Sequence, residues 1–531
     1  MTHVNPSTGA AATSYDRPPN QAMDDRRFLG HPRGLGLLFL VEMWERFSYY
    51  GMRALLVLYL VNALRWDPAR ASLLYGAYTG SVYLTPLLGG WLADRILGTR
   101  RSLVIGGLVI ALGHFLLAFG PSPVALGAAS PGSAAMLPFY LGLVCVVIGT
   151  GFFKPNVSTM VGQIYREGDN RRDAGFTIFY MGINLGAFLG PLVCGYLAQT
   201  PRYGWHWGFA AAGVGMLIGL ALYLSLREKY LPGIGVRDTT ARRASLTEGM
   251  DRQALRQSLG GAACGLIIGG LVTDWGVLGL VMGTIIGAAL GLAILGSHGE
   301  ERKRVIALFI VAFFVVFFWA TYDQSGSSMN LFADRNTNLQ LGSLRLRSSW
   351  FQSVNPALIL ICAPLFAWLW VRLGRRGWEP STALKMVLGL ALVGAGFLVM
   401  MLGGRRADHG VLVSPLWLVA AYSCHTWGEL CLSPVGLSYV TKVAPVRFAS
   451  LLMGVWFLAN GVADKIAGWL ASFTPTGAPS AHVMSGLAGV IQQHSATHAG
   501  FFALIAIIAF AASLLMLLFV PLLGRLVAGS W

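Results

Sequence analysis

Charged side chains are scarce in this sequence. They make up 12% of its 531 residues, whereas a soluble domain carries about 25%. Acidic residues are the scarcest, with 23 Asp and Glu against 39 Lys and Arg, so the formal net charge is +16. Hydrophobic residues account for 55%. This composition excludes a soluble enzyme, a disordered protein and a secreted disulfide scaffold, and it predicts a protein whose main partner is the lipid bilayer.

Sequence patterns that carry catalysis or cofactor binding are missing as well. The chain has no Gly-rich phosphate loop, no His and Cys set at metal-ligand spacing, and no Ser/His/Asp arrangement. Its six cysteines stand in apolar runs without a C-x-x-C pair, and we expect them to be buried structural thiols. We therefore expect no enzyme activity, no metal, no cofactor and no nucleic-acid partner.

Apolar runs long enough to cross a bilayer dominate what is present, since a spanning helix needs roughly 20 such residues. They predict an all-α membrane protein, because the strands of a membrane barrel are short and alternate in polarity. An even number of spans returns both termini to one side. The fourteen expected spans are 35–63, 71–94, 102–120, 136–162, 174–199, 205–226, 258–273, 276–296, 304–325, 350–372, 383–403, 415–440, 448–472 and 500–527.

The distribution of Lys and Arg sets the expected orientation. With a cytoplasmic N-terminus, most of the basic residues fall in cytoplasmic segments, as the positive-inside rule requires. The polar first 34 residues contain no signal peptide and are expected to be a cytoplasmic tail. The basic loop 227–256 serves as an orientation signal, and binding of anionic lipid headgroups is an alternative role for it.

The chain also resembles itself. The end of the stretch 90–101, GWLADRILGTRR, is partly repeated at 371–376, VRLGRR. Lys154-Pro155 and Ser433-Pro434 are expected to interrupt corresponding spans in the two halves. Two related six-helix halves are the architecture of a transporter that binds its substrate between them. The expected segments are a tail over 1–34, a bundle over 35–226, a basic loop with a Gly-rich peripheral helix pair over 227–303, and a second bundle over 304–527.

Nine ionisable residues fall within the spans, where each costs about 2.5–3.5 kcal/mol on insertion scales and is functional by default. Asp464 and Lys465 are expected near the outer end of their helix, in a packing or snorkelling role. The other seven carry the functional prediction: Glu42, Glu45, Arg46, Arg53, Lys154, Asp323 and Glu429.

The first span has the densest polar face. At about 100° per residue, Glu42, Glu45, Arg46, Tyr49 and Arg53 fall within one arc of the helix. This face must look into a water-filled space or at partners. Buried acids beside basic groups can load and release a proton, because making or breaking the ion pair changes their affinity for it. A static salt bridge between helices is the alternative.

These residues resemble the signatures of a known family. Glu42-x-x-Glu45-Arg46-Phe47-x-Tyr49-Tyr50-Gly51 is similar to the first-helix motif E-x-x-E-R-F-x-Y-Y-G of the proton-dependent oligopeptide transporters, in the major facilitator superfamily. The stretch 179–186, FYMGINLG, resembles the family motif F-Y-x-x-I-N-x-G, and 149–158 and 428–437 resemble its fourth helix and its later Glu-containing helix. The matches keep the family's order from about residue 35 to 470, and the two-helix insertion is typical of bacterial members.

The resemblance implies a proton-coupled symporter that imports di- and tripeptides across the inner membrane by alternating access. Its termini would be cytoplasmic, and we expect it to work as a monomer. The positions that match the family's proton-coupling groups are Glu42, Glu45, Arg46, Lys154 and Asp323. Those that match its peptide-binding groups are Arg53 and Lys154 for the carboxylate, Asn184, Asn355 and Glu429 for the amino group, and Tyr49, Tyr50, Tyr83, Ser433 and Trp456 for the pocket.

Five positions depart from the family pattern or leave alternatives open. Asp323 stands where many relatives carry Glu, so its partner is either Arg53 or Lys154. Gly76 stands where animal relatives carry a histidine, so proton coupling would have to run without that group. His425, one turn before Glu429, is expected to be a packing residue, with a proton relay as the alternative. Asn184 and Asn355 are expected to bind ligand, with interhelical hydrogen bonding as the alternative.

Three other functions compete with this prediction. The same fold hosts transporters of other anions and of amino-acid conjugates, although the Glu42 and Glu45 signature favours protons. A membrane enzyme has no candidate catalytic residues here. A channel would require rings of like residues around a pore, whereas these charges are mixed in sign and divided between two halves.

Overall fold

The computed structural model describes residues 25–125, 131–166, 168–236, 252–272, 276–445, 449–475 and 485–527. The expected tail before residue 25 and most of the basic loop, at 237–251, lie outside this part of the chain. Within it the protein is built from helices, and its strand pair is the short antiparallel hairpin of β1 (Gln340–Leu341) and β2 (Leu344–Arg345).

The helices fall into two groups with a pair between them. The first group consists of α2 (Arg33–Leu58) continued by η1 (Tyr59–Ala63), α3 (Pro68–Val82), α4 (Thr85–Leu92) continued by η2 (Ala93–Leu97), α5 (Thr99–Ala118), α6 (Ser133–Gln163), α7 (Arg171–Gln199) and α8 (Trp205–Tyr230). The pair is α9 (Arg252–Val272) and α10 (Val277–Leu290), which continues as η3 (Gly291–Leu295).

The second group begins with α11 (Gly299–Tyr322). It continues through η4 (Asp323–Gly326), α12 (Ser328–Arg335), η5 (Ser348–Ser353), α13 (Val354–Arg375), α14 (Thr382–Asp408), α15 (Leu416–Val443), α16 (Ala449–Ala471), α17 (Gly486–His494) and α18 (His498–Val527). One hydrophobic core lies wholly within residues 293–527, while two others are built almost entirely from residues 35–234. Each group therefore packs around apolar residues of its own.

The expected spans correspond to helices throughout, but their continuity was predicted less well. The span 71–94 is broken after Val82, and α4 restarts there with Pro86 in its first turn, where a missing N–H costs nothing. The expected interruptions at Pro155 and Pro434 are wrong, because α6 and α15 run through both prolines. The chain beyond 325 also continues as α12, and α17 had no expected counterpart.

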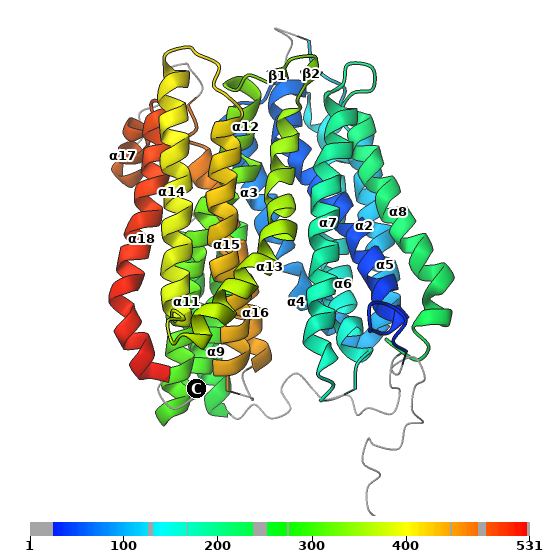
Figure 1. The fold of residues 1–531 in the computed structure, drawn as a ribbon, viewed down its shortest axis with the longest axis vertical. Helices are drawn as coiled ribbons and strands as arrows, with labels where there is room; N and C mark the ends of the chain where they lie inside the picture. The colour runs from blue at the N-terminus through cyan, green and yellow to red at the C-terminus, as the bar shows by residue number, and fades with distance from the viewer. Residues whose placement is uncertain are drawn as a thin grey trace, which may run out of the picture.

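The two groups meet mainly at one end of the molecule. Figure 1 shows α7 and α13 side by side near β1 and β2 and diverging toward the opposite end. We call the end with β1 and β2 the hairpin end and the opposite one the tail end. Hydrogen bonds join the groups at the hairpin end, from Asn62 to Asp334, from Trp350 to the Leu192 carbonyl and from Ser353 to the Phe188 carbonyl.

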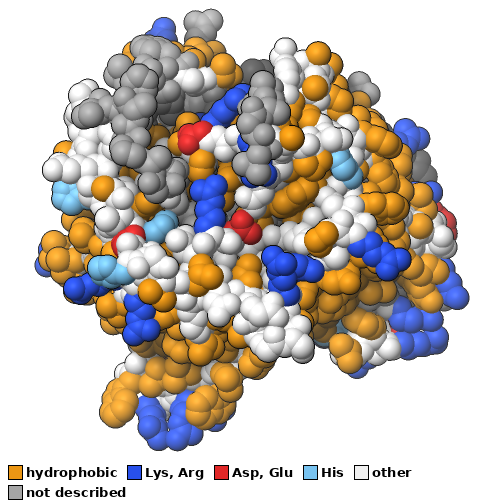
Figure 2. Space-filling view, turned by 90° about the horizontal axis from the view of Figure 1, so that it is seen from above, with side chains coloured by type: hydrophobic (Ala, Val, Ile, Leu, Met, Phe, Trp, Pro, Cys, Tyr) orange, Lys and Arg blue, Asp and Glu red, His pale blue; other side chains and the backbone are white. Residues whose placement is uncertain are grey.

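The outer surface of the helices is apolar. Large side chains such as Leu108, Leu112, Phe313, Trp368 and Leu518 are exposed. Seen from the hairpin end, apolar side chains dominate the flanks, whereas basic and polar ones are scattered over the middle (Figure 2). Within the described ranges, eight helices are long and apolar enough to cross a membrane. Such flanks are stable when they face lipid.

The expectation of six buried thiols holds for two of them. Cys194 and Cys431 are buried, Cys145, Cys362 and Cys424 are half-buried, and Cys264 on α9 is exposed. All six are free thiols. The difference arises because apolar residues of a membrane helix face lipid as often as they face the core, so an apolar run does not by itself imply burial.

Candidate functional site

Most of the charges expected within the spans lie where the two helix groups face each other. They form three clusters, which we name by their central residue. The Arg46 cluster lies on α2, the Arg53 cluster joins the two groups, and the Glu429 cluster lies in the second group.

In the Arg46 cluster, one guanidinium faces two acids. Arg46 Nε lies 2.9 Å from Glu42 Oε1 and 2.7 Å from Glu45 Oε2. All three side chains are almost completely buried. Arg46 donates a hydrogen bond to Glu42, whereas both carboxyl oxygens of Glu45 are buried without a hydrogen bond in the part of the chain that the structure describes. Glu45 is therefore held by charge alone.

Lys154 enters this region from α6. Its ammonium group interacts electrostatically with Glu42, Glu45 and Arg46, and it lies 5.0 Å from the centre of the Tyr83 ring. The sequence signature thus brings two acids and two bases together from two helices. Because the acids and bases are balanced, a proton added to either glutamate changes the net charge of the cluster.

The Arg53 cluster connects the first group to the second. Arg53 Nη2 donates to Asp323 Oδ1 at 2.5 Å, and Arg53 Nε donates to the Tyr75 hydroxyl at 2.5 Å. The partner of Asp323, left open between Arg53 and Lys154, is therefore Arg53. Tyr50 packs beside the guanidinium, with its ring centre 5.8 Å from the Arg53 Cζ.

In the Glu429 cluster, one carboxylate is held by neutral donors. Glu429 Oε2 accepts hydrogen bonds from the Tyr322 hydroxyl at 2.6 Å and from Asn355 Nδ2 at 2.9 Å. Asn355 also donates to Thr426 Oγ1. The carboxylate is buried and has no cation among its hydrogen-bond partners in the described chain. A positively charged ligand group would supply the missing charge.

The other expected binding residues surround these clusters with less direct contact. Tyr49 and Tyr50 pack edge to face at 5.2 Å. Ser433, one turn beyond Glu429, has a buried hydroxyl without a hydrogen bond among described residues. Asn184 donates to the Tyr180 carbonyl of its own helix, and no hydrogen bond joins it to Glu429 among the described residues. Trp456 packs into the core of the second group, with its ring close to Gly436 of α15.

Glycines explain why α2 presents its charges in this place. A Cβ on Gly186 would overlap the Met43 carbonyl oxygen and lie 2.9 Å from Arg46 Cβ. Gly190 approaches the backbone of Phe47 and Gly51 in the same way, and Gly51 faces Cys194. Small residues let helices approach closely. The glycines within the two sequence signatures therefore hold α2 against α7 and fix the direction of the acids.

The snorkelling alternative for Asp464 is wrong, and two useful tyrosines were overlooked. Asp464 is 4% exposed and interacts with Asp323, Arg53 and Thr79, so it is not a snorkelling group. Its position between Asp323 of its own helix group and Arg53 of the other was not visible in the sequence. Tyr75 and Tyr322 could have been noticed, because they directly precede Gly76 and Asp323. His425 is buried against Phe397, at 4.6 Å between ring centres, as expected for a packing residue.

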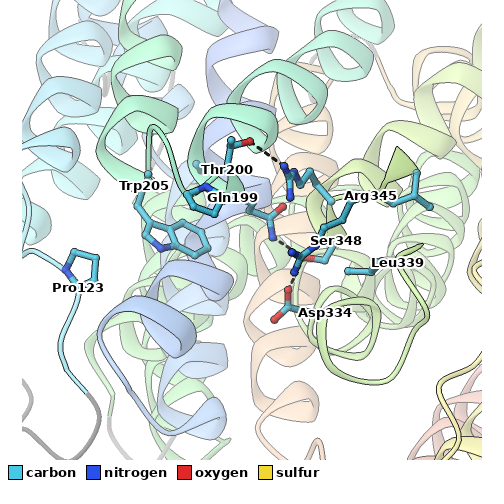
Figure 3. Close-up of a pocket in the computed structure, with 13 residues that line it drawn as sticks. Pro123, Gln199, Thr200, Trp205, Asp334, Leu339, Arg345 and Ser348 are labelled. Atoms are coloured by element: carbon cyan, nitrogen blue, oxygen red, sulfur yellow. Dashed lines mark hydrogen bonds between the residues drawn. The ribbon is translucent and has the colours of Figure 1, made fainter. Parts of the chain in front are cut away.

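A separate pocket of about 390 Å³ lies at the hairpin end. Figure 3 shows Arg345, Asp334 and Ser348 of the second group facing Gln199 and Thr200 of the first. Arg347 donates to Thr200 Oγ1, and Gln199 Nε2 donates to Ser348 Oγ at 2.7 Å. These hydrogen bonds join the two helix groups at the hairpin end.

Comparison with known proteins decides which family has this arrangement. A model of the POT family matches residues 100–232 and 288–485. The chain belongs to the POT family. Relatives include the uncharacterised transporter YclF of Bacillus subtilis, 41% identical over 84% of this chain and 89% of the relative, and peptide transporter YePEPT of Yersinia enterocolitica, 37% identical over 83% and 88%. A di-/tripeptide transporter of Lactococcus lactis is 35% identical over 88% and 95%.

Solved structures of POT transporters share the fold. A mutant of peptide transporter POT with alafosfalin is 37% identical, with a TM-score of 0.76 over 96% of this chain and 99% of the other. A POT family transporter with 5-aminolevulinic acid is 30% identical, with a TM-score of 0.75 over 95% and 100%. These likenesses confirm the all-α major facilitator fold expected from the sequence, and they show that this POT family member is a membrane transporter rather than an enzyme.

Proposed function

We propose that this protein is a proton-coupled symporter that imports di- and tripeptides by alternating access. The observation that carries the proposal is the separation of charge between the helix groups. The first group contributes three buried or half-buried cations, Arg46, Arg53 and Lys154, whereas Glu429 in the second group has only neutral hydrogen-bond partners. A peptide zwitterion has the complementary charges at its two ends.

In this proposal the peptide carboxylate binds toward Arg53 and Lys154. An arginine gives two parallel hydrogen bonds to a carboxylate, and a lysine adds a point charge. The amino group binds toward Glu429, with Asn355, Asn184 and Ser433 as further hydrogen-bond partners. Tyr49, Tyr50, Tyr83 and Trp456 would form apolar walls that accept varied side chains. A site that reads the two ends of a peptide tolerates differences between them.

Proton coupling would act through the Arg46 cluster. Glu42 and Glu45 share one guanidinium, and Lys154 lies close enough to exchange its interaction with them for one with the peptide carboxylate. Losing the lysine favours protonation of a glutamate, because the carboxylate then lacks part of its compensating charge. Asp323 would take part in coupling through the Arg53 cluster, where its ion pair with Arg53 joins the two groups.

We further propose a topology for the bacterial inner membrane. The hairpin end would face outward and the tail end, with both chain termini, would face the cytoplasm. The halves would be the bundles 35–226 and 304–527, with 1–34 as a tail and 227–303 as a connecting insertion. Each bundle has its own apolar core, which supports movement of one against the other in a monomer. The hydrogen bonds at the hairpin end would make this conformation inward-facing.

The test is uptake of a labelled dipeptide into liposomes that contain the purified protein. An imposed gradient, acidic outside, should drive accumulation above the external concentration, and a protonophore should abolish it. The same dipeptide without an imposed gradient should only equilibrate. Absence of dipeptide uptake, or uptake that is indifferent to the protonophore, contradicts the proposal.

A non-peptide zwitterion is a second candidate substrate. One structural neighbour is described in complex with 5-aminolevulinic acid, which also carries an ammonium and a carboxylate group. Competition decides between the two classes. Excess 5-aminolevulinic acid should compete weakly with the labelled dipeptide if peptides are the main substrate, whereas strong competition together with its own gradient-driven uptake would favour the smaller amino acid.

A further inference from the structure

Asp464 is an acid buried at the contact between the two helix groups, and the proton-coupling site proposed above does not use it. It lies on α16, and 4% of its surface is exposed. Its helix crosses α3 through glycines: a Cβ on Gly76 would lie 2.7 Å from the Gly468 Cα and 2.8 Å from the Asp464 carbonyl oxygen. Gly80 approaches the Gly461 carbonyl oxygen to 2.8 Å by the same measure. This close crossing places Asp464 against the first group.

The groups that face Asp464 come from several helices. Asp323, directly after α11, and Thr79 of α3 lie beside it, and Arg53 of α2 interacts with it electrostatically. Helix α10, which also packs against α16, has no titratable residue between Val277 and Leu290. Tyr322 of α11 and Glu429 of α15 interact with Asp323, and Lys465 follows Asp464 on its own helix. Further electrostatic neighbours are Tyr49 of α2, Tyr75 of α3, Tyr83 directly after α3, and Lys154 of α6.

The charges around this crossing do not balance. Arg53 makes its ion pair with Asp323 at 2.5 Å, so Asp464 is a second acid beside a cation that already has a partner. Lys154 is shared with Glu42 and Glu45, which already face Arg46. A buried carboxylate without its own cation is costly in a membrane. The closed crossing is therefore most stable with one proton on the two aspartates.

We propose that Asp464 and Asp323 form a proton-binding pair that gates the contact between α3 and α16. With one proton on the pair, Arg53 balances the remaining negative charge and the helices close. When the proton leaves, two negative side chains face one guanidinium in a nearly dry crossing, and the helices separate so that water reaches them. The charge state of Asp464 thus controls whether α3 and α16 are in contact, and Asp464 does not bind the peptide.

The proposal rests on the proposed symport, because it adds a second proton-binding place to that of Glu42 and Glu45. Its consequence for conformation can be measured without transport. If closing the crossing takes up one proton, the ratio of open to closed molecules rises with pH by up to about tenfold per pH unit. The direction follows because the closed form binds the proton more tightly than the open form does.

The test measures the distance between spin labels on the two groups at the hairpin end, in full-length protein in liposomes. Trp207 of α8 and Leu412 before α15 are 60% and 59% exposed and suit labelling after Trp207→Cys and Leu412→Cys, in a variant whose native cysteines are replaced. In otherwise unchanged protein, the short-distance population should decrease as pH rises. Asp464→Asn, which is always neutral, should keep that population high and reduce the pH dependence by about one proton.

Two further variants complete the test. Asp464→Glu keeps an ionisable group and should restore the pH dependence, which would exclude a purely structural effect of the asparagine. Asp408→Asn is the matched control, because Asp408 caps α18 through the His498 and Ala499 amides and lies outside the crossing. It should behave like the unchanged protein. An unchanged pH profile in Asp464→Asn overturns the proposal. A lack of dipeptide uptake by a protein whose distances respond as expected overturns only the proposed function.

Discussion

The Glu45 carboxylate differs from its neighbours in having charge partners but no hydrogen bonds among the described residues. Its side chain is completely buried, and Arg46 Nε lies 2.7 Å from one of its oxygens. A carboxylate held in this way is protonated more readily than one that accepts several hydrogen bonds. We therefore choose Glu45 as the first acid of the Arg46 cluster to test for a role in coupling, since the Glu42 carboxylate accepts a hydrogen bond from Arg46.

The first prediction concerns Glu45→Gln. A permanently neutral side chain cannot carry a proton through the cycle, so gradient-driven accumulation of dipeptide should fall by at least roughly tenfold, which corresponds to 1.4 kcal/mol. Exchange of internal for external peptide needs no net proton movement and should persist. Both are measured in the same liposome preparation. Accumulation that survives at its original level contradicts a coupling role for Glu45.

The second prediction concerns Glu429→Gln. Removing the negative charge should weaken dipeptide binding by about 1.5–3 kcal/mol, the usual contribution of a hydrogen bond to a charged group. The amide can still pair with Tyr322 and Asn355, so the helix should remain in place. Binding is measured by titration calorimetry in detergent. Ser423→Ala on the same helix is the control, since among the described residues the Ser423 hydroxyl donates to the Val419 carbonyl of that helix and not to another helix. Equal affinities would remove Glu429 from the amine site.

Residue types and their spacing anticipated much of this chemistry but not the pairing. The sequence placed Glu42, Glu45 and Arg46 on one helix face, because three and four residues separate neighbours on a helix. Arg53 and Asp323 are 270 residues apart, and no local pattern selects Asp323 over other acids. Asp464 was misjudged for the same reason: its surroundings are set by the crossing of α3 and α16.

Among the helices, α2 and α7 form a close contact that supports the site. Glycines on α7 meet the backbone of α2 where the acids begin. The third prediction is that Gly186→Ala destabilises the protein by about 1–3 kcal/mol, because the added methyl overlaps the Met43 carbonyl and forces the helices apart. It should also impair driven uptake, since Arg46 lies at the same contact. The thermal midpoint in detergent is the measurement.

Gly524→Ala is a matched control for that substitution. Gly524 also lies within a helix, α18, but nothing occupies the space around an added Cβ. There, alanine should be neutral or stabilise by roughly 0.5–1 kcal/mol, because glycine is the weaker helix former. If both substitutions shift the midpoint alike, helix propensity and not the contact with α2 governs position 186.

The beginning of α7 supplies the fourth prediction, which concerns acid stability. Hydrogen bonds from the Arg171 side chain and amide lower the pKa of Asp169 from 3.8 to about 2. A depressed pKa stabilises the folded state above the unfolded-state value, and this contribution is lost as pH falls through the folded-state value. Asp169→Asn should thus lower the thermal midpoint by a constant amount above about pH 4. The difference in thermal midpoint between Asp169→Asn and the unchanged protein should shrink toward pH 3 and below. A difference that does not vary with pH would contradict an origin in the lowered pKa of Asp169.

Element boundaries were predicted where hydropathy changes and missed where it does not. The helices α5 to α8 begin and end within a few residues of the expected spans. The break between α3 and α4 was missed because both sides are apolar, and the prolines within α6 and α15 were given too much weight. Transmembrane helices accommodate proline when neighbouring helices satisfy the freed backbone groups.

For the whole molecule, the equilibrium between conformations that are closed and open at the hairpin end depends on the hydrogen bonds that join the two helix groups there. Gln199 makes two of the best placed, donating to Ser348 Oγ and accepting from Ser349 Oγ, each at 2.7 Å. The fifth prediction is that Gln199→Ala increases the population open at the hairpin end by about tenfold, because two neutral hydrogen bonds contribute roughly 0.5–1.5 kcal/mol each. The spin-label pair described above reports it.

Gln340→Ala is the control for the Gln199 variant. Gln340 lies on the exposed β1 strand, and its side chain bonds to Gly342 of the same hairpin. Its removal should leave the distance distribution unchanged. If Gln199→Ala and Gln340→Ala give the same distribution as the unmodified protein, the hairpin end is held by other contacts, such as the one between Asn62 and Asp334.

The crossing at Gly76 and Gly468 bears on the speed of the transport cycle. The backbones of α3 and α16 touch there without side chains between them. Separating the two helices therefore requires no change of side-chain rotamer and no withdrawal of a side chain from a packed pocket. The two helices can therefore separate without unlocking interdigitated side chains. The rate at which this contact opens should depend more on the charges beside it than on side-chain packing. A single methyl group at either glycine would clash with the facing backbone and keep the two helices apart. Such a variant would favour the conformation in which this crossing is open, and it offers a simple means of trapping that conformation for structure determination.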